Sequence, residues 1–322
     1  SVATVSKSLS NKSDVSAKTR AKILKVCAQL GYRPNPLVSA LMRVRRRKGR
    51  ASTRLTLAFV TAFPTENEWR KHPAPIFAQM FAGASQRALE RNYRLEHFWL
   101  HRDGMSNARF SQVMIHRNIT GLLLAPVPDT RTTIDLDWDA FSIVVLGLTP
   151  NTRRFHRVAT DYYQSMMLSM EECFRLGYRR PGLAVRLETI NRLERRWEGA
   201  YLVEGQRFSA TTLPRPLFVE EWTAQNVAEW LEKEKPDVVI GPVLGALETH
   251  IRAAGFRIPN EIGLVGLVVP EWGNRLSGIF QDGEGMGAAA IDQLVAQIER
   301  NERGIPSHPV THTMAVRWNP GR

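Results

Sequence analysis

The sequence predicts an α/β protein in which a small helical head precedes a larger body of parallel sheets. From Leu55 onward, short apolar runs alternate with helix-length amphipathic patterns. That alternation indicates βαβ units, and hence parallel sheets covered by helices. The charge marks the head: residues 1–54 contain fourteen of the 44 basic side chains and one of the 31 acidic ones. Because the remaining residues hold 30 of each sign, the head carries the whole net charge of +13.

The head is expected to contain two helices joined by a polar turn. A short helix is expected over Val2–Leu9, and a longer one over Ser16–Leu30, with Ser16 as its N-cap and Gly31 as its stop. A third helix can begin after Asn35, with a proline at its first position. It is too short to be stable alone in water, so it needs a partner or a ligand.

The body is expected to contain two similar sheets, because it holds many strands for its length. The expected strands cover 55–62, 95–100, 121–125, 143–148, 182–186, 217–219, 237–241, 262–269 and 310–316. The expected helices cover 76–91, 106–117, 162–176, 191–205, 223–234, 244–255 and 287–300.

Composition and motifs argue against several other classes of protein. No apolar run reaches the roughly twenty residues that cross a bilayer, and no secretory signal is visible, so we expect a cytoplasmic protein. The glycine-rich segment 282–287 comes too late in the chain for a dinucleotide fingerprint and is better explained as a helix entry. His308 and His312 flank a proline and do not have metal-ligand spacing, and neither cysteine has a nearby histidine. The sequence therefore predicts no catalytic residue, no metal and no cofactor.

The two head helices have the pattern of a helix–turn–helix, whose reading helix places its N-terminal residues at base edges in the major groove. A solvated polar helix is the alternative interpretation. In the DNA-binding interpretation, Val2, Ala3 and Lys7 lie at base edges, and Ser1, Thr4 and Ser6 donate hydrogen bonds to phosphates or bases.

Three segments of the head strongly resemble the DNA-binding head of lactose-repressor-type (LacI/GalR) transcription regulators. They are Val-Ala-Thr-Val-Ser-Lys-Ser-Leu at 2–9, Val-Ser-Ala-Lys-Thr-Arg at 15–20 and Leu-Gly-Tyr-Arg-Pro-Asn at 30–35. In that family another helix precedes the reading helix, so we expect this chain to begin at the reading helix, with the first helix missing. The resemblance implies a DNA-binding head over 1–34 and a hinge helix with a basic linker over 35–54.

The resemblance also implies that the hinge helix forms on DNA, where the paired hinges of a homodimer open the minor groove of a palindromic operator. Leu41 matches the inserted leucine, and Val38 stands where the family usually has a small residue. The alternative is that Leu37 and Leu41 only pack the hinge onto the body or onto the hinge of the second protomer. A nuclear localisation signal is a rival interpretation of the arginine run. The expected DNA-binding residues are Ser1, Val2, Ala3, Thr4, Ser6, Lys7, Asn11, Lys18, Thr19, Tyr32, Asn35, Val38, Leu41 and Arg45.

Residues 55–322 resemble, more loosely, the effector-binding body of the same regulators. That body has the fold of periplasmic sugar-binding proteins, with two doubly wound lobes and a ligand cleft between them. The resemblance implies one lobe from 55–156 with 282–304 and another from 157–281 with 305–322. The expected function is sequence-specific transcription regulation, by family habit repression, controlled by a small effector such as a sugar or related metabolite. A sugar or sugar-phosphate binding protein or enzyme with no DNA role is the alternative.

The expected cleft departs from the family pattern. Pro242 and Val243 replace an Asn-Asp pair, and 267–269 is apolar where an acidic residue is expected. Because unpaired hydroxyls are costly to bury, either the effector is less polar than a sugar, held against Phe77 or Trp272, or the protein has drifted from sugar sensing. Alternatively, both aromatic residues only pack in the core. Arg196 likewise has an alternative role, in an ion pair at the surface or between the lobes. The expected effector-binding residues are Phe77, Asp161, Arg196, Trp272 and Gln281.

Overall fold

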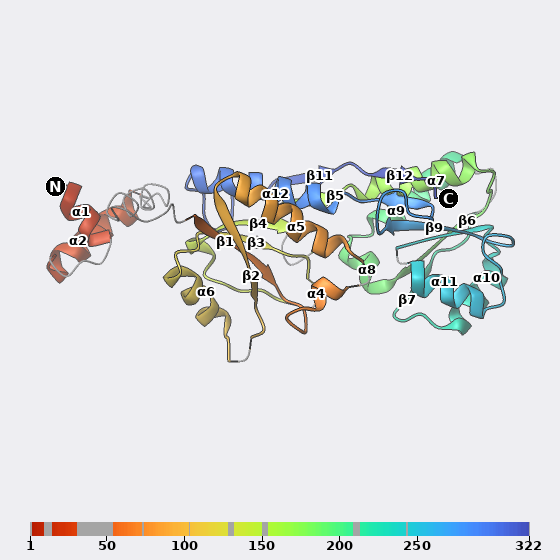
Figure 1. Cartoon of the computed structure of the whole chain (residues 1–322), viewed down its shortest axis with the longest axis horizontal. Helices are drawn as coiled ribbons and strands as arrows, with labels where there is room; N and C mark the ends of the chain where they lie inside the picture. Colours follow the sequence, from red (N-terminus) through yellow and green to blue (C-terminus); the bar gives the residue numbers. More distant parts are fainter. Residues whose placement is uncertain are drawn as a thin grey trace.

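The computed structural model describes residues 2–9, 15–30, 54–72, 74–102, 104–127, 132–149, 154–208, 213–242 and 244–321. They form a helical head and an α/β body of two lobes, each built on one six-stranded sheet (Figure 1). We call the lobe that begins at β1 the N-lobe and the lobe that begins at α7 the C-lobe.

The head contains two packed helices, α1 (Val2–Leu9) and α2 (Ala17–Gln29). Ser16 begins α2 as expected, because its Oγ accepts the amide hydrogen of Thr19 at 3.3 Å. In α1 the Ser8 hydroxyl donates to the carbonyl oxygen of Thr4 at 2.9 Å, which satisfies this buried side chain within its own helix. The expected hinge helix lies outside the described residues.

The N-lobe has a wholly parallel sheet in the order β11-β5-β4-β3-β1-β2. Helices α5 and α12 pack over one face, and α6 lies over the other, each above its own apolar core. The strands are β1 (Leu55–Thr61), β2 (Tyr93–Trp99), β3 (Gly121–Leu124), β4 (Ser142–Leu146), β5 (His156–Thr160) and β11 (Thr311–Met314). The helices are α4 (Glu68–Lys71), α5 (Ile76–Glu90), α6 (Asn107–His116), the 3₁₀ turn η1 (Trp138–Ala140) and α12 (Gly283–Glu299).

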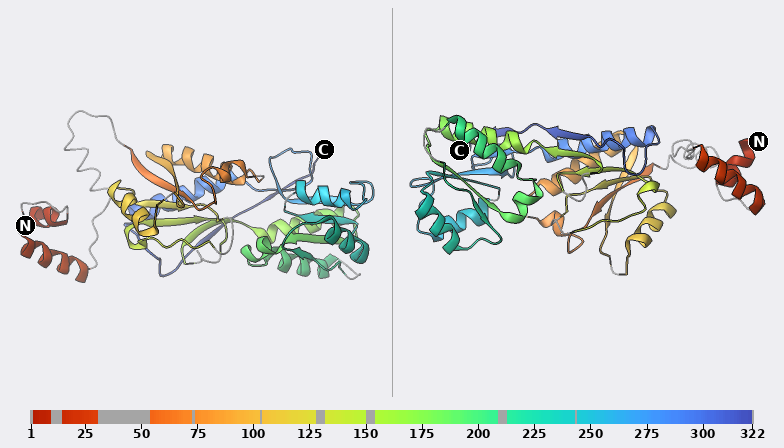
Figure 2. Two further views of the ribbon diagram at one scale, coloured as in Figure 1. Left: turned by 90° about the horizontal axis from the view of Figure 1, so that it is seen from below. Right: turned by 180° about the vertical axis from the view of Figure 1, so that it is seen from behind.

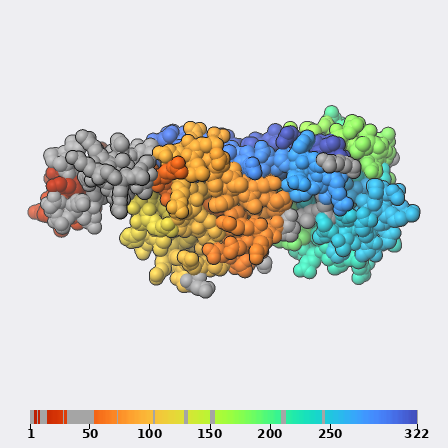
Figure 3. Space-filling view, in the orientation of Figure 1, coloured from red at the N-terminus to blue at the C-terminus, as the bar shows by residue number. Residues whose placement is uncertain are grey.

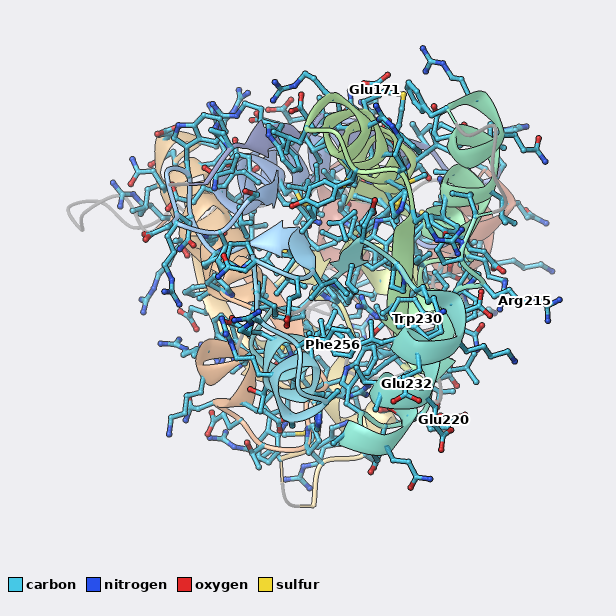
Figure 4. The ribbon with its side chains drawn as sticks, turned by 90° about the vertical axis from the view of Figure 1, so that its right-hand side faces the viewer. Glu171, Arg215, Glu220, Trp230, Glu232 and Phe256 are labelled. Carbon is cyan, nitrogen blue, oxygen red and sulfur yellow. The ribbon has the colours of Figure 1, made fainter. Side chains whose placement is uncertain are left out.

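The C-lobe sheet has the order β12-β10-β9-β8-β6-β7, and β12 runs antiparallel to β10. At the outer end of this lobe the Trp230 indole donates to the carbonyl oxygen of Arg215 at 2.7 Å (Figure 4). The strands are β6 (Pro181–Arg186), β7 (Leu217–Val219), β8 (Val238–Gly241), β9 (Gly263–Val269), β10 (Gly278–Phe280) and β12 (Arg317–Asn319). The helices are α7 (Tyr162–Arg175), α8 (Leu187–Arg192), α9 (Arg196–Phe208), α10 (Ala224–Glu234) and α11 (Leu244–Ala253).

The predicted fold class is confirmed, with an α-helical head and two sheets that are parallel apart from β12. Three strands, β5, β10 and β12, and three short helices, α4, η1 and α8, were not expected from the sequence. Strands β10 and β12 have three residues each, too few for a pattern. In β5 the buried positions include His156 and Arg157, so the strand does not read as an apolar run.

The chain passes between the lobes three times, after β5, after β10 and after β11 (Figure 2). Because β5 pairs with β4, and β11 pairs with β5, both strands belong to the N-lobe sheet. The lobes therefore change after residues 160 and 314, not after 156 and 304 where the sequence led us to expect a boundary. The remaining change of lobe precedes α12, which packs on α5 and β4.

Helices α5 and α12 approach each other so closely that only glycine fits at the crossing. A Cβ atom on Gly83 would lie 2.0 Å from the carbonyl oxygen of Glu284, and one on Gly287 would lie 2.0 Å from that of Met80. The two backbones therefore hold each other in a fixed position. Since α5 also carries Phe77, this crossing fixes one wall of the cleft described below.

The two cysteines differ in burial, which predicts a difference in reactivity. Burial raises the pKa of the Cys173 thiol well above its usual value, whereas Cys27 in the head is only partly buried. Because the thiolate is the reactive form, a disulfide reagent should modify one thiol per chain in the folded protein and two after unfolding. Absorbance of the released chromophore counts the thiols. Rapid modification of both in the folded protein would contradict the buried position of Cys173.

Candidate functional site

A cleft of about 310 Å³ lies between the lobes and is lined by residues of both. The lobes lie side by side along the long axis of the molecule, orange and yellow beside cyan (Figure 3). The volume falls at the lower end of the range of small-molecule sites. Residues at or just after the carboxyl ends of the parallel strands line it, including Phe63 after β1, Pro126 after β3 and Gly147 after β4. This is where open α/β sheets bind ligands.

The N-lobe wall is mainly apolar and aromatic. Phe63 and Phe77 meet edge to face with ring centroids 5.4 Å apart, and His72 meets Phe77 in the same way at 4.7 Å. Short helix α4 brings Glu68 and His72 to this wall. The N-lobe residues that line the cleft are Phe63, Glu68, His72, Ala74, Ile76, Phe77, Met80, Pro126, Val127 and Gly147.

The C-lobe wall holds more of the polar groups. The Arg186 guanidinium and the Glu188 carboxylate form an ion pair at 2.7 Å, and the Tyr162 ring meets Trp197 edge to face at 5.7 Å. Pro242 and Val268 also lie here, at two of the segments where the sequence lacks the expected amide and carboxylate. The C-lobe residues that line the cleft are Tyr162, Arg186, Glu188, Thr189, Arg192, Leu193, Trp197, Trp222, Pro242, Val268 and Gln281.

Two of the expected effector-binding residues, Phe77 and Gln281, line this cleft. The Gln281 side chain is buried, and both of its polar atoms already have partners. Its Oε1 accepts from the Thr160 hydroxyl at 3.1 Å, and its Nε2 donates to the carbonyl oxygen of Leu267 at 3.1 Å. Gln281 therefore connects the two lobes at the second crossing, and only its remaining amide hydrogen and lone pair can meet a ligand.

The other three expected residues lie outside the residues that line the cleft. The Asp161 carboxylate caps α7 by accepting the Gln164 amide hydrogen at 2.9 Å. The Arg196 guanidinium pairs with Glu194 at 3.3 Å. Trp272 is 51% exposed, and the Arg317 guanidinium lies 4.6 Å from its ring centroid. Their assignment to effector binding remains a prediction.

The sequence did not indicate most of the residues that line the cleft, among them Glu68, His72, Tyr162, Arg192, Trp197 and Trp222. A usable signal existed for Tyr162 and Trp222, which follow the ends of β5 and β7 by two and three residues. No comparable signal marked Arg192. It lies at the end of α8, a helix of six residues that directly follows β6, whereas the sequence pattern predicted a single helix over 191–205.

Burial and charge hold His72 in its neutral form. Burial lowers the pKa of His72 below its usual value, and the positive charge of Arg192 lowers it further. Nδ1 of the ring accepts the Ala74 amide hydrogen at 3.1 Å. The neutral ring therefore carries its proton on Nε2. Burial likewise raises the pKa of Tyr162, so its hydroxyl stays protonated.

A direct hydrogen bond also joins the N-lobe to the C-lobe. Nε2 of Gln79, in α5 of the N-lobe, donates to the carbonyl oxygen of Pro270, after β9 of the C-lobe, at 3.0 Å. A change in the angle between the lobes would alter this bond together with the cleft.

Four of the expected DNA-binding residues have described side chains: Thr4, Lys7, Lys18 and Thr19. Lys7, Lys18 and Thr19 are exposed, and the two on α2 lie in its first turn. Val2, Ala3 and Ser6 lie within α1, but only their backbone is described. The expected residues outside the described part are Ser1, Asn11, Tyr32, Asn35, Val38, Leu41 and Arg45.

Neither a metal site nor a membrane-spanning helix is found in the part of the chain that the structure describes. Within the described ranges, no group of three or more His, Cys, Asp and Glu side chains could hold a metal ion. None of the described helices is both long and apolar enough to cross a membrane.

Comparison with known proteins gives matches to the head and to the whole chain. Residues 1–35 match the family described as "Bacterial regulatory proteins, lacI family". The NTD biosynthesis operon regulator NtdR of Bacillus subtilis (strain 168) is 22% identical over 278 residues, covering 82% of this chain and 77% of that protein.

Solved structures resemble the whole chain in fold. A complex of the transcriptional regulator CelR with cellobiose matches with a TM-score of 0.61 and 19% identity, covering 100% of this chain and 96% of that one. A lac repressor dimer bound to operator and the anti-inducer ONPF matches with a TM-score of 0.57 and 20% identity, covering 99% of this chain and 95% of that one.

Proposed function

Since the chain belongs to the lacI family of bacterial regulatory proteins, we propose that it is a sequence-specific DNA-binding transcription regulator controlled by a small molecule. The observation that carries this function is the combination, on one chain, of the family's DNA-binding head with a two-lobed body. The cleft between the lobes is the effector site. The regulator acts as a homodimer on a palindromic operator, because a two-fold dimer presents two equivalent reading heads.

The regulatory mechanism is linkage between the cleft and the head. An effector that touches both walls binds one arrangement of the lobes better than another, and it shifts the population toward that arrangement. The groups that sense this shift include Gln281 and Gln79, which hydrogen-bond across the lobes. The N-lobe leads directly into the basic linker, so its orientation in the dimer sets the spacing of the two hinges.

We also propose that the protein acts in the cytoplasm, together with the DNA that it binds, and that it catalyses no reaction. By family habit the regulator acts as a repressor.

Selection of bound sequences from a random DNA pool, followed by gel-shift titration, tests the proposed function on the full-length protein. We expect enrichment of a palindrome bound about 10³-fold or more above non-specific DNA. Binding to all sequences with equal affinity would refute sequence-specific regulation.

Substitution of one exposed lysine of the head tests its contact with phosphate. Lys18→Ala should weaken binding about equally for all DNA sequences, and it should reduce the slope of log affinity against log salt by about one for each head that contacts DNA. The matched control is Lys233→Ala, an exposed lysine in α10 of the C-lobe. A change in base preference in Lys18→Ala would instead indicate a contact with base edges.

A further inference from the structure

Three hydrogen-bond donors lie at the cleft without an acceptor in the part of the chain that the structure describes. Arg192 lines the cleft, and its guanidinium makes no hydrogen bond or ion pair there. The indole Nε1–H of Trp197 is buried and has no partner. The third donor is the Nε2–H of His72, whose Nδ1 already accepts the Ala74 amide.

Two of these donors come from opposite lobes and line the same cleft. Arg192 belongs to α8 of the C-lobe, whereas His72 follows α4 of the N-lobe. Both side chains line the same cleft of about 310 Å³, one from each wall, and the charge of Arg192 adds to burial in lowering the pKa of His72, whereas the charge of Glu68 acts in the opposite direction. A group that accepts from both would bridge the lobes.

The acceptors of the cleft do not match these donors. The Glu188 carboxylate is paired with Arg186 at 2.7 Å, and Oε1 of Gln281 accepts from Thr160. Glu68, on the N-lobe wall, accepts the Thr65 amide hydrogen at 3.4 Å and can still accept from a ligand hydroxyl or amide. Because a partly buried cation without a counterion is costly, Arg192 is placed to receive an anion.

The remaining walls favour an apolar body on that ligand. Phe63, Phe77, Met80, Trp222 and Pro242 offer rings and aliphatic carbon. These five side chains provide no partners for hydroxyls, so Glu68 and the few other polar side chains of the cleft would have to pair all the hydroxyls of a sugar, each of which is costly to bury unpaired. The volume of 310 Å³ holds about ten water molecules, which suits a ligand with one aromatic ring and one acidic group.

We propose that the effector is a small aromatic carboxylate whose anionic group binds between Arg192 and His72, with the Trp197 indole as a third donor. This inference rests on the proposed function, because it names the ligand class of the same cleft. The carboxylate draws the two lobes together through one donor from each, and the ring lies against Phe77.

Calorimetric titration of the intact protein tests the proposal, with benzoate, its neutral counterpart benzamide, and glucose as probes. We expect benzoate to bind at least about tenfold more tightly than benzamide, because hydrogen bonds to a charged group are the stronger ones. Arg192→Gln should lose that preference, lowering benzoate affinity by about 10- to 100-fold. Arg175→Gln is the matched control, since Arg175 is also in the last turn of a C-lobe helix and is exposed.

A second variant keeps the test decisive if Arg192→Gln does not fold. Trp197→Phe retains a ring and removes a donor that is unpaired in the free protein, which offsets part of the cost of the smaller side chain in the core. This variant should therefore remain folded while benzoate binding weakens about fivefold.

Several outcomes would overturn the proposal. Benzoate would fail to bind at about 10 mM, benzamide would bind as tightly as benzoate, or glucose would bind more tightly than benzoate. The proposal would also be wrong if Arg196→Gln lost affinity for benzoate and Arg192→Gln did not. A gel shift on the selected operator, run without any probe, separates the two claims. If the protein binds its operator specifically but does not bind benzoate, the proposed ligand class is wrong and the proposed regulator function is unaffected.

Discussion

Raising the salt concentration from about 50 to 200 mM should weaken operator binding by about 10³-fold or more. The physical reason is counterion release: each lysine or arginine that neutralises a phosphate releases condensed cations from DNA, and added salt opposes that release. Residues 1–54 of each chain contain fourteen basic side chains, seven of them in the twelve residues from Arg43 to Arg54. Two such heads in a dimer can make the six or more phosphate contacts that this loss requires.

Fluorescence anisotropy of a labelled operator, titrated at several salt concentrations, measures the slope. Replacing Arg45, Arg46 and Arg47 by glutamine should reduce the slope by about 0.9 for each phosphate that the linker no longer neutralises, on operator and non-specific DNA alike. Circular dichroism over the same salt range controls for unfolding. A slope shallower than about two would mean that the linker does not contact phosphates, and that the charge of the head has another role.

Gly287→Ala should destabilise the N-lobe by about 3 kcal/mol. Replacing a glycine inside a helix by alanine ordinarily stabilises a protein by about 0.5–1 kcal/mol, so here the sign is reversed. A Cβ at this position would lie 2.0 Å from the carbonyl oxygen of Met80 and 2.7 Å from the amide nitrogen of Ala84. Both are backbone atoms of α5, so no side-chain rotation relieves the clash and the helices must separate.

Denaturant unfolding followed by circular dichroism measures the loss. The matched control is Gly199→Ala in α9, where a Cβ would meet no atom within 4 Å; this variant should gain about 0.5–1 kcal/mol. Equal stability of the two variants would show that α5 and α12 are not held in backbone contact. Since α5 carries Phe77 and Met80 of the cleft wall, Gly287→Ala should also lower the affinity of the cleft for its ligand.

The fold was predictable from the sequence wherever an element was long and regular. The alternation of apolar runs and amphipathic helices predicted two sheets, and Ser16 marked the start of α2. Strand β5 escaped because its buried His156 and Arg157 interrupt the apolar run. The structure explains the burial of His156: its Nε2 lies 2.8 Å from Glu302, and its Nδ1 accepts the Val310 amide hydrogen. Tertiary partners, which periodicity cannot show, make these polar side chains acceptable in the interior.

The cleft was predictable only in part. Resemblance to the family pointed to Phe77 and Gln281, which line it, and the loss of polar residues at 242 and 268 agrees with its apolar walls. The donors Arg192 and His72 could not be found in this way. His72 depends on α4, a helix of four residues, and Arg192 depends on α8, a helix of six residues that the sequence pattern did not separate from α9. They lie more than a hundred residues apart and meet only because the two lobes face each other.

The three crossings between the lobes also determine the order in which the protein can fold during synthesis. The N-lobe begins at β1 but lacks α12 and β11 until residue 314 has been made. Until then, one face of its sheet stays without the apolar side chains of α12, among them Ile291 and Leu294. Most of the C-lobe, from α7 to β10, is one continuous segment and can fold sooner. The first lobe to be translated therefore cannot be completed until most of the C-lobe has been made, and in the interval its exposed apolar face is open to aggregation on the ribosome.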